Sequence, residues 1–142
     1  MSELCEQYTE DLTKKEMHMW NGKNDFGYVY PQGNIFDNSN LSNILRQCGG
    51  KPKHCHLNDY DTRGKGKAQP EYIITLKKDI NTIIVIECKK SIKNHMSQDL
   101  DMPSKYAVDG VLYYAKYLKE EYNVIAIAVS GTSKQKFLSS SF

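Results

Sequence analysis

Two glutamates and a lysine have the residue types and spacing needed for metal-assisted chemistry. Glu71 follows Pro70, and Glu87 lies two residues before Lys89, each beside a short segment rich in Ile, Val, Tyr and Thr. Facing carboxylates in a low-dielectric environment repel each other unless a cation or a proton neutralises them. Carboxylate oxygens are hard ligands that suit Mg²⁺ or Mn²⁺. These residues therefore favour a divalent metal site with a lysine beside it.

A β-hairpin is the element that would bring the two glutamates together. Residues 72–76 and 82–88 have the composition of strands and are too short for helices. A loop centred on Asp79 places Glu71 directly opposite Glu87. Side chains alternate between the two faces of a strand. The second strand then has Ile83, Val85, Glu87 and Lys89 on one face and Ile84, Ile86 and Cys88 on the other. Both faces are apolar until the strand ends, which is typical of a central strand covered on both sides.

Pro70-Glu71, followed sixteen positions later by Glu87-Cys88-Lys89, resembles the signature of the PD-(D/E)xK nuclease superfamily, with Glu in place of the usual Asp. The wider context is similar to the N-terminal nuclease domain of type I restriction enzyme motor subunits, over residues 83–90, 113–118 and 124–131. The resemblance covers roughly residues 39–131. It implies an α/β, restriction-endonuclease-like fold, in which helices flank a mixed β-sheet. It also implies a Mg²⁺- or Mn²⁺-dependent endonuclease that hydrolyses DNA without sequence specificity as an isolated domain.

The resemblance assigns roles to the residues of the signature. Glu71, Glu87 and the backbone carbonyl of Cys88 would hold the metal, while Lys89 would orient or help deprotonate the attacking water. Asp37 is the nearest candidate for an additional acid, with a helix cap as its alternative role. Related nucleases often place a Gln in the helix about one turn before the Tyr-Ala pair. That place holds Asp109-Gly110 here, and Gln98 and Tyr113 are the available substitutes.

A basic, glycine-containing segment precedes the first catalytic strand. Residues 51–69 carry the cationic or histidine side chains Lys51, Lys53, His54, His56, Arg63, Lys65 and Lys67. We expect DNA phosphates to contact Arg63, Lys65, Lys67 and Lys90. An ordinary solvated loop is an equal alternative. The cysteines and histidines at positions 48 and 54–56 lack a recognised zinc-finger spacing and a second ligand pair.

Helical and strand patterns surround the hairpin. A loose helical pattern covers residues 2–19, and residues 26–34 read as a short strand or a loop cover. The sequence predicts helices over about 40–48 and 104–122, and a buried strand over 124–130. By the right-handed crossover rule, this strand should run parallel to the Glu87 strand. Residues 132–142 show no obvious element.

Length and composition predict one intracellular domain. The chain has 142 residues, a formal charge of +2, no basic or apolar leader, and no apolar run long enough to span a membrane. Its four cysteines are irregularly spaced and are expected to be reduced thiols. The polar C-terminal segment predicts the N-terminal part of a longer protein. The resemblance places fused or associated motor or methyltransferase regions there.

Four alternatives remain open at this point. The chain could be a catalytically inactive nuclease-fold module that binds nucleic acid or docks a motor, because Glu71 and the missing Gln depart from the family pattern. The same fold and metal chemistry could also act on RNA instead of DNA. A thiol sensor would rest on Cys88 beside Lys89, although Cys88 is predicted to lie on the apolar face. The interpretation without a function is that both glutamates are solvent-exposed residues at strand ends and that Lys89-Lys90 only makes the surface more soluble.

Overall fold

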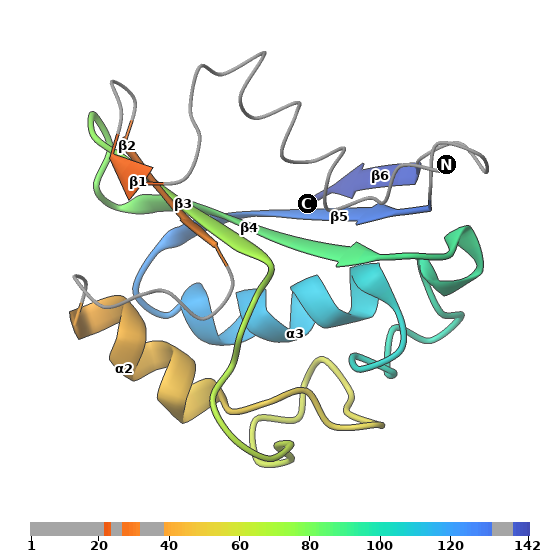
Figure 1. The fold of residues 1–142 in the computed structure, drawn as a ribbon. Coiled ribbons are helices and arrows are strands. Elements are labelled where there is room, and N and C mark those ends of the chain that lie inside the picture. Colours follow the sequence, from red (N-terminus) through yellow and green to blue (C-terminus); the bar gives the residue numbers. More distant parts are fainter. Residues whose placement is uncertain (1–21, 24–26, 32–38, 132–137) are drawn as a thin grey trace.

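The computed structural model describes residues 22–23, 27–31, 39–131 and 138–142. The predicted helix over residues 2–19 and the candidate acid Asp37 lie outside these ranges. The described elements are β1 (Gly22–Lys23), β2 (Gly27–Pro31), α2 (Ser39–Cys48), β3 (Tyr72–Leu76), β4 (Thr82–Lys89), the 3-10 helix η1 (Ile92–Asn94), α3 (Ala107–Leu118), β5 (Asn123–Ser130) and β6 (Leu138–Ser141). They form an α/β structure with one mixed sheet (Figure 1).

The sheet has six strands in the order β1-β2-β3-β4-β5-β6. Neighbouring strands are antiparallel except for β4 and β5, which run parallel and are joined through α3. The predicted parallel strand after the helix is therefore confirmed. Within the described residues, no helix is long and apolar enough to cross a membrane.

The hairpin of β3 and β4 has the predicted register. Tyr72 pairs with Ile86, and Ile73 pairs with Val85. The turn is fixed by Asp79, whose carboxylate accepts hydrogen bonds from the Asn81 amide at 3.2 Å and the Thr82 hydroxyl at 2.6 Å. The bond from the Asn81 amide is of the side-chain to backbone kind that makes Asp common in turns. The last pair at the open end is Tyr72 with Ile86, and Glu71 and Glu87 lie directly beyond it.

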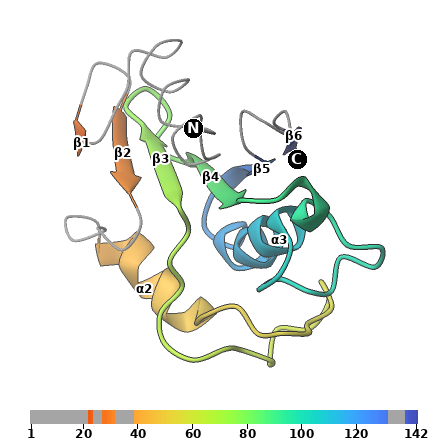
Figure 2. The ribbon, with the colours of Figure 1, turned by 45° about the vertical axis from the view of Figure 1, so that its right-hand side comes forward.

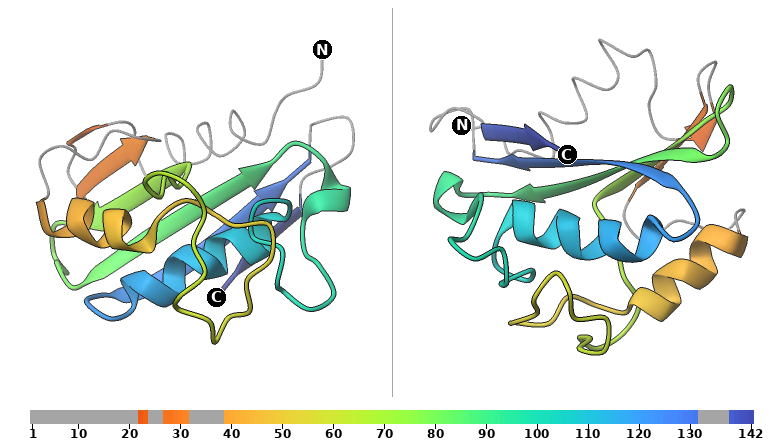
Figure 3. Two further views of the ribbon diagram at one scale, coloured as in Figure 1. Left: turned by 90° about the horizontal axis from the view of Figure 1, so that it is seen from below. Right: turned by 180° about the vertical axis from the view of Figure 1, so that it is seen from behind.

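Both faces of β4 are buried, as its composition predicts. On one face, Ile83 and Val85 belong to a core that also contains residues of α2 and α3. On the other face, Ile86 and Cys88 belong to a second apolar cluster with strand residues such as Val129. Both described helices lie on the same side of the sheet, with α2 nearer β2 and β3 and α3 below β4 and β5 (Figures 2 and 3).

The helix predictions are confirmed in their placement and corrected at some ends. The helix α2 matches the predicted 40–48 and ends at Cys48, and the Gly49 that follows adopts a φ of +72°. The helix α3 begins at Ala107 instead of Ser104, because residues 103–105 form a turn in which the amides of Lys105 and Tyr106 donate to Met102 O. It ends at Leu118, and further turns lead to β5.

The strand β2 decides an assignment that the sequence left open, and the strand β6 was not predicted from the sequence. Residues 27–31 form β2, so the described part of the aromatic segment is a strand and not a loop cover. The prediction that no element follows residue 132 is wrong, because β6 pairs with β5. The backbone of Phe142 also exchanges hydrogen bonds with Ala126 at 2.8 and 3.0 Å. This pairing satisfies backbone groups along β5 that would otherwise lack a partner in the sheet.

Candidate functional site

The candidate site lies where β3 begins and β4 ends. Glu87 projects from β4 toward the helix side of the sheet and is 2% exposed. Its Oε1 accepts a hydrogen bond from the backbone N–H of Glu71 at 3.1 Å. Its Oε2 lies 2.5 Å from the Nζ of Lys51, which comes from the loop after α2. Both oxygens of this carboxylate are therefore engaged, one of them by a full positive charge.

The helix α3 leaves room for this ion pair at Gly110. A Cβ at that position would lie 3.4 Å from Glu87 Oε2, 3.3 Å from Lys51 Cδ and 2.8 Å from the carbonyl oxygen of Pro103. The glycine thus allows the helix to pack directly against the charged pair. This is the place where related nucleases often have a Gln, and here it has a backbone surface instead.

Asp109, the neighbour of Gly110, has a different task. It is 1% exposed and accepts hydrogen bonds from the backbone amides of Ser97 at 3.1 Å and Met102 at 3.0 Å, and from the Ser97 hydroxyl. These bonds tie the segment before α3 to the first turn of the helix. A carboxylate near a helix N-terminus is also favoured by the helix dipole. Asp109 therefore organises the loop and is not directed at Glu87 by any of these contacts.

An aromatic side chain borders the ion pair one turn further along α3. The Lys51 Nζ lies 5.6 Å from the centroid of the Tyr114 ring. Burial raises the pKa of Tyr114, and the negative charge of Glu87 raises it further. The phenol consequently stays protonated, and the pair lies in surroundings where charge interactions are stronger than in water.

The other residues of the signature lie close by with separate contacts. Glu71 is half-buried directly before β3, and its main chain contacts Glu87. Lys89 is half-buried, and its Nζ donates a hydrogen bond to the Ser104 carbonyl at 3.0 Å. Cys88 lies on the opposite face of β4 among apolar side chains and is 4% exposed. This burial removes the basis for a thiol sensor at Cys88, while the structure brings Glu71, Glu87 and Lys89 to one end of the hairpin.

The basic side chains predicted to bind DNA are divided between protein contacts and solvent. Arg63 donates to the Tyr60 carbonyl at 3.2 Å and lies 5.7 Å from the Tyr117 ring centroid. Lys67 donates to the Ser42 hydroxyl at 3.2 Å. Lys65 and Lys90 are exposed. Arg63 and Lys67 thus help to fix the loop, while Arg63, Lys65 and Lys90 are all exposed to solvent.

The fixed loop explains how Lys51 reaches Glu87. Gly50 and Gly64 form an isolated β-bridge, and the Gly50 amide donates to Gly66 O at 3.1 Å. A Cβ on Gly50 would lie 2.2 Å from the carbonyl oxygen of Lys65, so this close backbone approach requires glycine. The hydroxyl of Tyr113 donates to the carbonyls of Cys48 at 2.8 Å and Gly50 at 3.1 Å. Tyr113 therefore positions the residue preceding Lys51 and does not replace the missing Gln at the carboxylate. The other substitute considered, Gln98, is exposed.

A second buried lysine anchors the same loop. Lys116 is 5% exposed, and its Nζ donates to the carbonyls of His56 at 3.3 Å and Asp59 and lies 3.2 Å from Cys55 Sγ. Three tyrosine ring centroids lie within 4.9–5.5 Å of it, those of Tyr60, Tyr113 and Tyr117. Cys55 is thus part of this lysine's surroundings. Among the described residues, no three His, Cys, Asp or Glu side chains gather as a metal would require.

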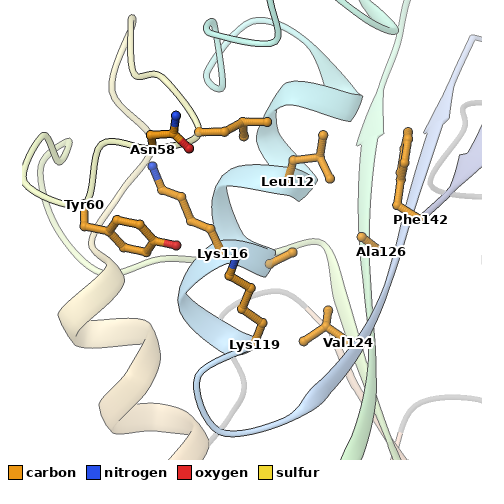
Figure 4. Close-up of a pocket in the computed structure, with 10 residues that line it drawn as sticks. Asn58, Tyr60, Leu112, Lys116, Lys119, Val124, Ala126 and Phe142 are labelled. Atoms are coloured by element: carbon orange, nitrogen blue, oxygen red, sulfur yellow. The ribbon is translucent and has the colours of Figure 1, made fainter.

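The described residues also form a pocket on another side of α3. It has a volume of about 310 Å³ and lies between α3, β5 and the loop around Asn58 (Figure 4). Lys119 and the stem of Lys116 line it together with apolar side chains such as Leu112 and Val124. Neither Glu71, Glu87 nor Lys89 lines this pocket, so it is separate from the candidate site.

The site residues fit a divalent metal under one condition. Glu71 and Glu87 offer the carboxylate oxygens that Mg²⁺ prefers. Glu87 is buried and needs a positive charge beside it, and Lys51 supplies that charge in the structure. A divalent cation would therefore compete with the ammonium group of Lys51 for the Glu87 carboxylate.

Sequence reasoning missed Lys51 as a member of the site. In the sequence it is one of several cationic residues in the same loop, 36 positions before Glu87. The only sequence signal that bears on it is Gly110, whose missing side chain makes space for the pair. Comparison of the chain with protein-family models, curated proteins and solved structures finds no match.

Proposed function

We propose that the protein is a Mg²⁺- or Mn²⁺-dependent nuclease module that hydrolyses phosphodiester bonds of DNA. The observation that carries this proposal is the hairpin register. It brings the main chain of Glu71 against the Glu87 carboxylate, with Lys89 two residues further along the same strand. Two acids and a lysine at one strand end have a chemical use in phosphodiester hydrolysis, whereas burying a carboxylate there has a cost in folding free energy.

The topology supports the same proposal. The strands β2, β3 and β4 form an antiparallel meander, and α3 connects β4 to the parallel strand β5. A mixed sheet of this kind is what a restriction-endonuclease-like fold would have. Because folds host many functions, the argument for hydrolysis rests on the site and not on the topology alone.

Each side chain has a defined part in the proposed reaction. Glu71, Glu87 and the carbonyl of Cys88 would hold the metal ion, which when bound supplies Lewis-acid activation of water and neutralises charge on the phosphate. Lys89 would turn from the Ser104 carbonyl to the attacking water, which it would orient and help deprotonate. Lys65 and Lys90, being exposed, would contact the DNA backbone and position it.

A DNA cleavage assay tests the proposal. Single- and double-stranded DNA are incubated with the protein and Mg²⁺ or Mn²⁺, and the wild type is compared with Glu87→Ala and Lys89→Ala. We expect metal-dependent cutting that falls by about a hundredfold or more in Lys89→Ala, in the range expected for loss of an acid-base group. Lys78→Ala, at the exposed turn end of the same hairpin, is the matched control and should cut normally.

The second candidate is a noncatalytic module that binds nucleic acid or docks a motor or methyltransferase. The Lys51–Glu87 ion pair favours it, because the carboxylate already has a partner from the protein. So does the replacement of the expected Gln by Asp109-Gly110. Under this function, wild-type protein would not cut DNA or RNA, and its DNA affinity would be the same with Mg²⁺ and with EDTA. Cutting of RNA but not DNA would change the substrate while keeping the chemistry.

A further inference from the structure

The ammonium group of Lys51 lies where a metal ion on Glu87 would need to bind. We propose that a divalent cation binds this site by displacing the Lys51 side chain, which serves as an exchangeable internal counter-ion. This inference rests on the proposed metal-dependent function. It adds to that function a residue that sets how tightly the site takes its metal.

Burial of Glu87 is the first part of the argument. The Glu87 side chain is 3% exposed, and the Lys51 Nζ lies 2.5 Å from its Oε2. A buried carboxylate that lacks a positive partner is strongly disfavoured. A metal ion on the same oxygen would place two cationic groups side by side, where their repulsion is large. Either the ammonium or the metal ion therefore occupies Oε2, but not both.

The freedom of the Lys51 side chain is the second part. It is 17% exposed, several times more than its partner, so its end can reach solvent without unfolding the core. The backbone before it is held separately, by hydrogen bonds from Gly50 to Gly66 and from Tyr113 to Gly50. The side chain can consequently leave while the loop keeps its place.

The helix surface beside the pair is the third part. Gly110 has no side chain, and the Lys51 stem and the Glu87 carboxylate both lie within 3.4 Å of where a Cβ would be. At this position the stem meets the backbone of α3 and no side chain, and the Tyr114 ring one turn further on lies 5.6 Å from its Nζ. In contrast, Lys116 is 5% exposed and is surrounded by tyrosine rings and carbonyl groups. These contacts hold the Lys116 side chain in place, and Lys51 has fewer of them.

Displacement has a measurable consequence for metal affinity. If only the state with an open ion pair binds metal, the apparent affinity is reduced by the fraction of molecules in that state. Removing the ammonium should therefore tighten metal binding by about tenfold or more. Metal binding should in turn release Lys51 to solvent in the wild-type protein.

Two measurements on the full chain test these statements. The first is Mn²⁺ binding by isothermal titration calorimetry to the wild type, Lys51→Met, Glu87→Gln and the matched control Lys53→Met, an exposed lysine on the same loop. The second is acetylation of the wild type by acetic anhydride with and without Mg²⁺, read by mass spectrometry for Lys51 and normalised to Lys78. The acetylation measurement uses only the wild-type protein, so it tests the proposal even if Lys51→Met fails to fold.

We expect Lys51→Met to bind Mn²⁺ about tenfold more tightly or better, Lys53→Met to match the wild type, and Glu87→Gln to lose binding. Acetylation of Lys51 should rise several-fold when Mg²⁺ saturates the site. If the wild type binds metal through Glu87 while Lys51→Met binds no better and Lys51 labelling is unchanged, displacement is wrong and the nuclease proposal stands. If neither the wild type nor Lys51→Met binds metal, or Glu87→Gln binds as well as the wild type, both proposals fail.

Discussion

The Lys51–Glu87 pair makes a sharp prediction about stability, independent of any metal. In Lys51→Met the carboxylate keeps its hydrogen bond from the Glu71 amide but loses its ion pair with Lys51. Removing one partner of a buried ion pair costs about 3–5 kcal/mol in the free energy of unfolding. We expect a loss of about 3–4 kcal/mol at pH 7, in the lower part of this range because the Lys51 side chain is 17% exposed.

The reverse substitution should cost less, because the two side chains are not equally buried. In Glu87→Gln the amide oxygen can still accept the Glu71 amide, and Lys51, which is 17% exposed, can turn its ammonium toward water. Loss of the charged hydrogen bond then costs about 1.5–3 kcal/mol. Adding Glu87→Gln to Lys51→Met removes the unpaired charge, so the double variant should be more stable than Lys51→Met alone.

Urea unfolding at pH 7 in EDTA measures this cycle, with m-values compared to confirm that the same surface is exposed in each variant. A domain with a typical stability of about 5–15 kcal/mol would remain folded in every variant of the cycle. Lys53→Met, on the same loop, should change the free energy of unfolding by no more than about 0.5 kcal/mol. A loss below about 1 kcal/mol in Lys51→Met, or simple additivity in the double variant, would refute the coupling of a buried pair.

Three further predictions concern the sheet, a histidine and a cysteine. Ile86→Ala should lower the free energy of unfolding by about 2–5 kcal/mol, because Ile86 is 4% exposed. The control Ile80→Ala, at a turn residue that is 77% exposed, should change the free energy of unfolding by no more than about 0.5 kcal/mol. Equal effects of the two substitutions in urea unfolding would contradict the burial of β4. Burial lowers the pKa of His95 in the folded protein, so as the pH falls the imidazole is protonated more readily in the unfolded chain than in the folded one. The free energy of unfolding should therefore decrease as the pH drops below about 6.5. Urea midpoints at several pH values should show this fall in the wild type and less of it in His95→Gln. Burial raises the pKa of Cys48 to about 12, so a thiol reagent should label it only when the protein unfolds, and rapid labelling of the native protein would count against this placement.

Sequence reasoning located the hairpin because the information for it is local. Strand composition, the polar turn and Asp79 lie within one continuous segment, and the Asp79 side chain bonds within three residues of itself. Alternation along β4 then fixed which residues share a face, including the placement of Cys88 away from Glu87. The parallel strand β5 followed from the crossover rule, which depends on chain handedness and not on particular side chains.

The missed features depend on partners that the local sequence does not specify. The strand β6 consists of Leu138–Ser141, mostly serines with little strand preference, and forms through backbone pairing with β5. The helix α3 begins later than Ser104 because the segment before it is held by Asp109, a contact that residue propensity does not reveal. Lys51 reaches Glu87 only because the glycine bridge and Tyr113 fix the loop.

The ion pair also determines how the two candidate functions are told apart. A permanent pair would make Glu87 a structural residue, and a noncatalytic module would then keep Lys51 paired whether or not metal is present. An exchangeable pair makes the same carboxylate a latent metal ligand, because the charge that stabilises it during folding can be replaced by a stronger cation. Both cases predict a large loss of stability in Lys51→Met, so stability alone does not separate them. The separation comes from linkage: a cation that binds only the folded protein must raise its stability in proportion to RT ln(1 + [metal]/Kd). Mg²⁺ should therefore raise the stability of the wild type and leave Glu87→Gln unchanged if the pair is exchangeable, whereas the wild type should gain no stability from Mg²⁺ if the pair is permanent.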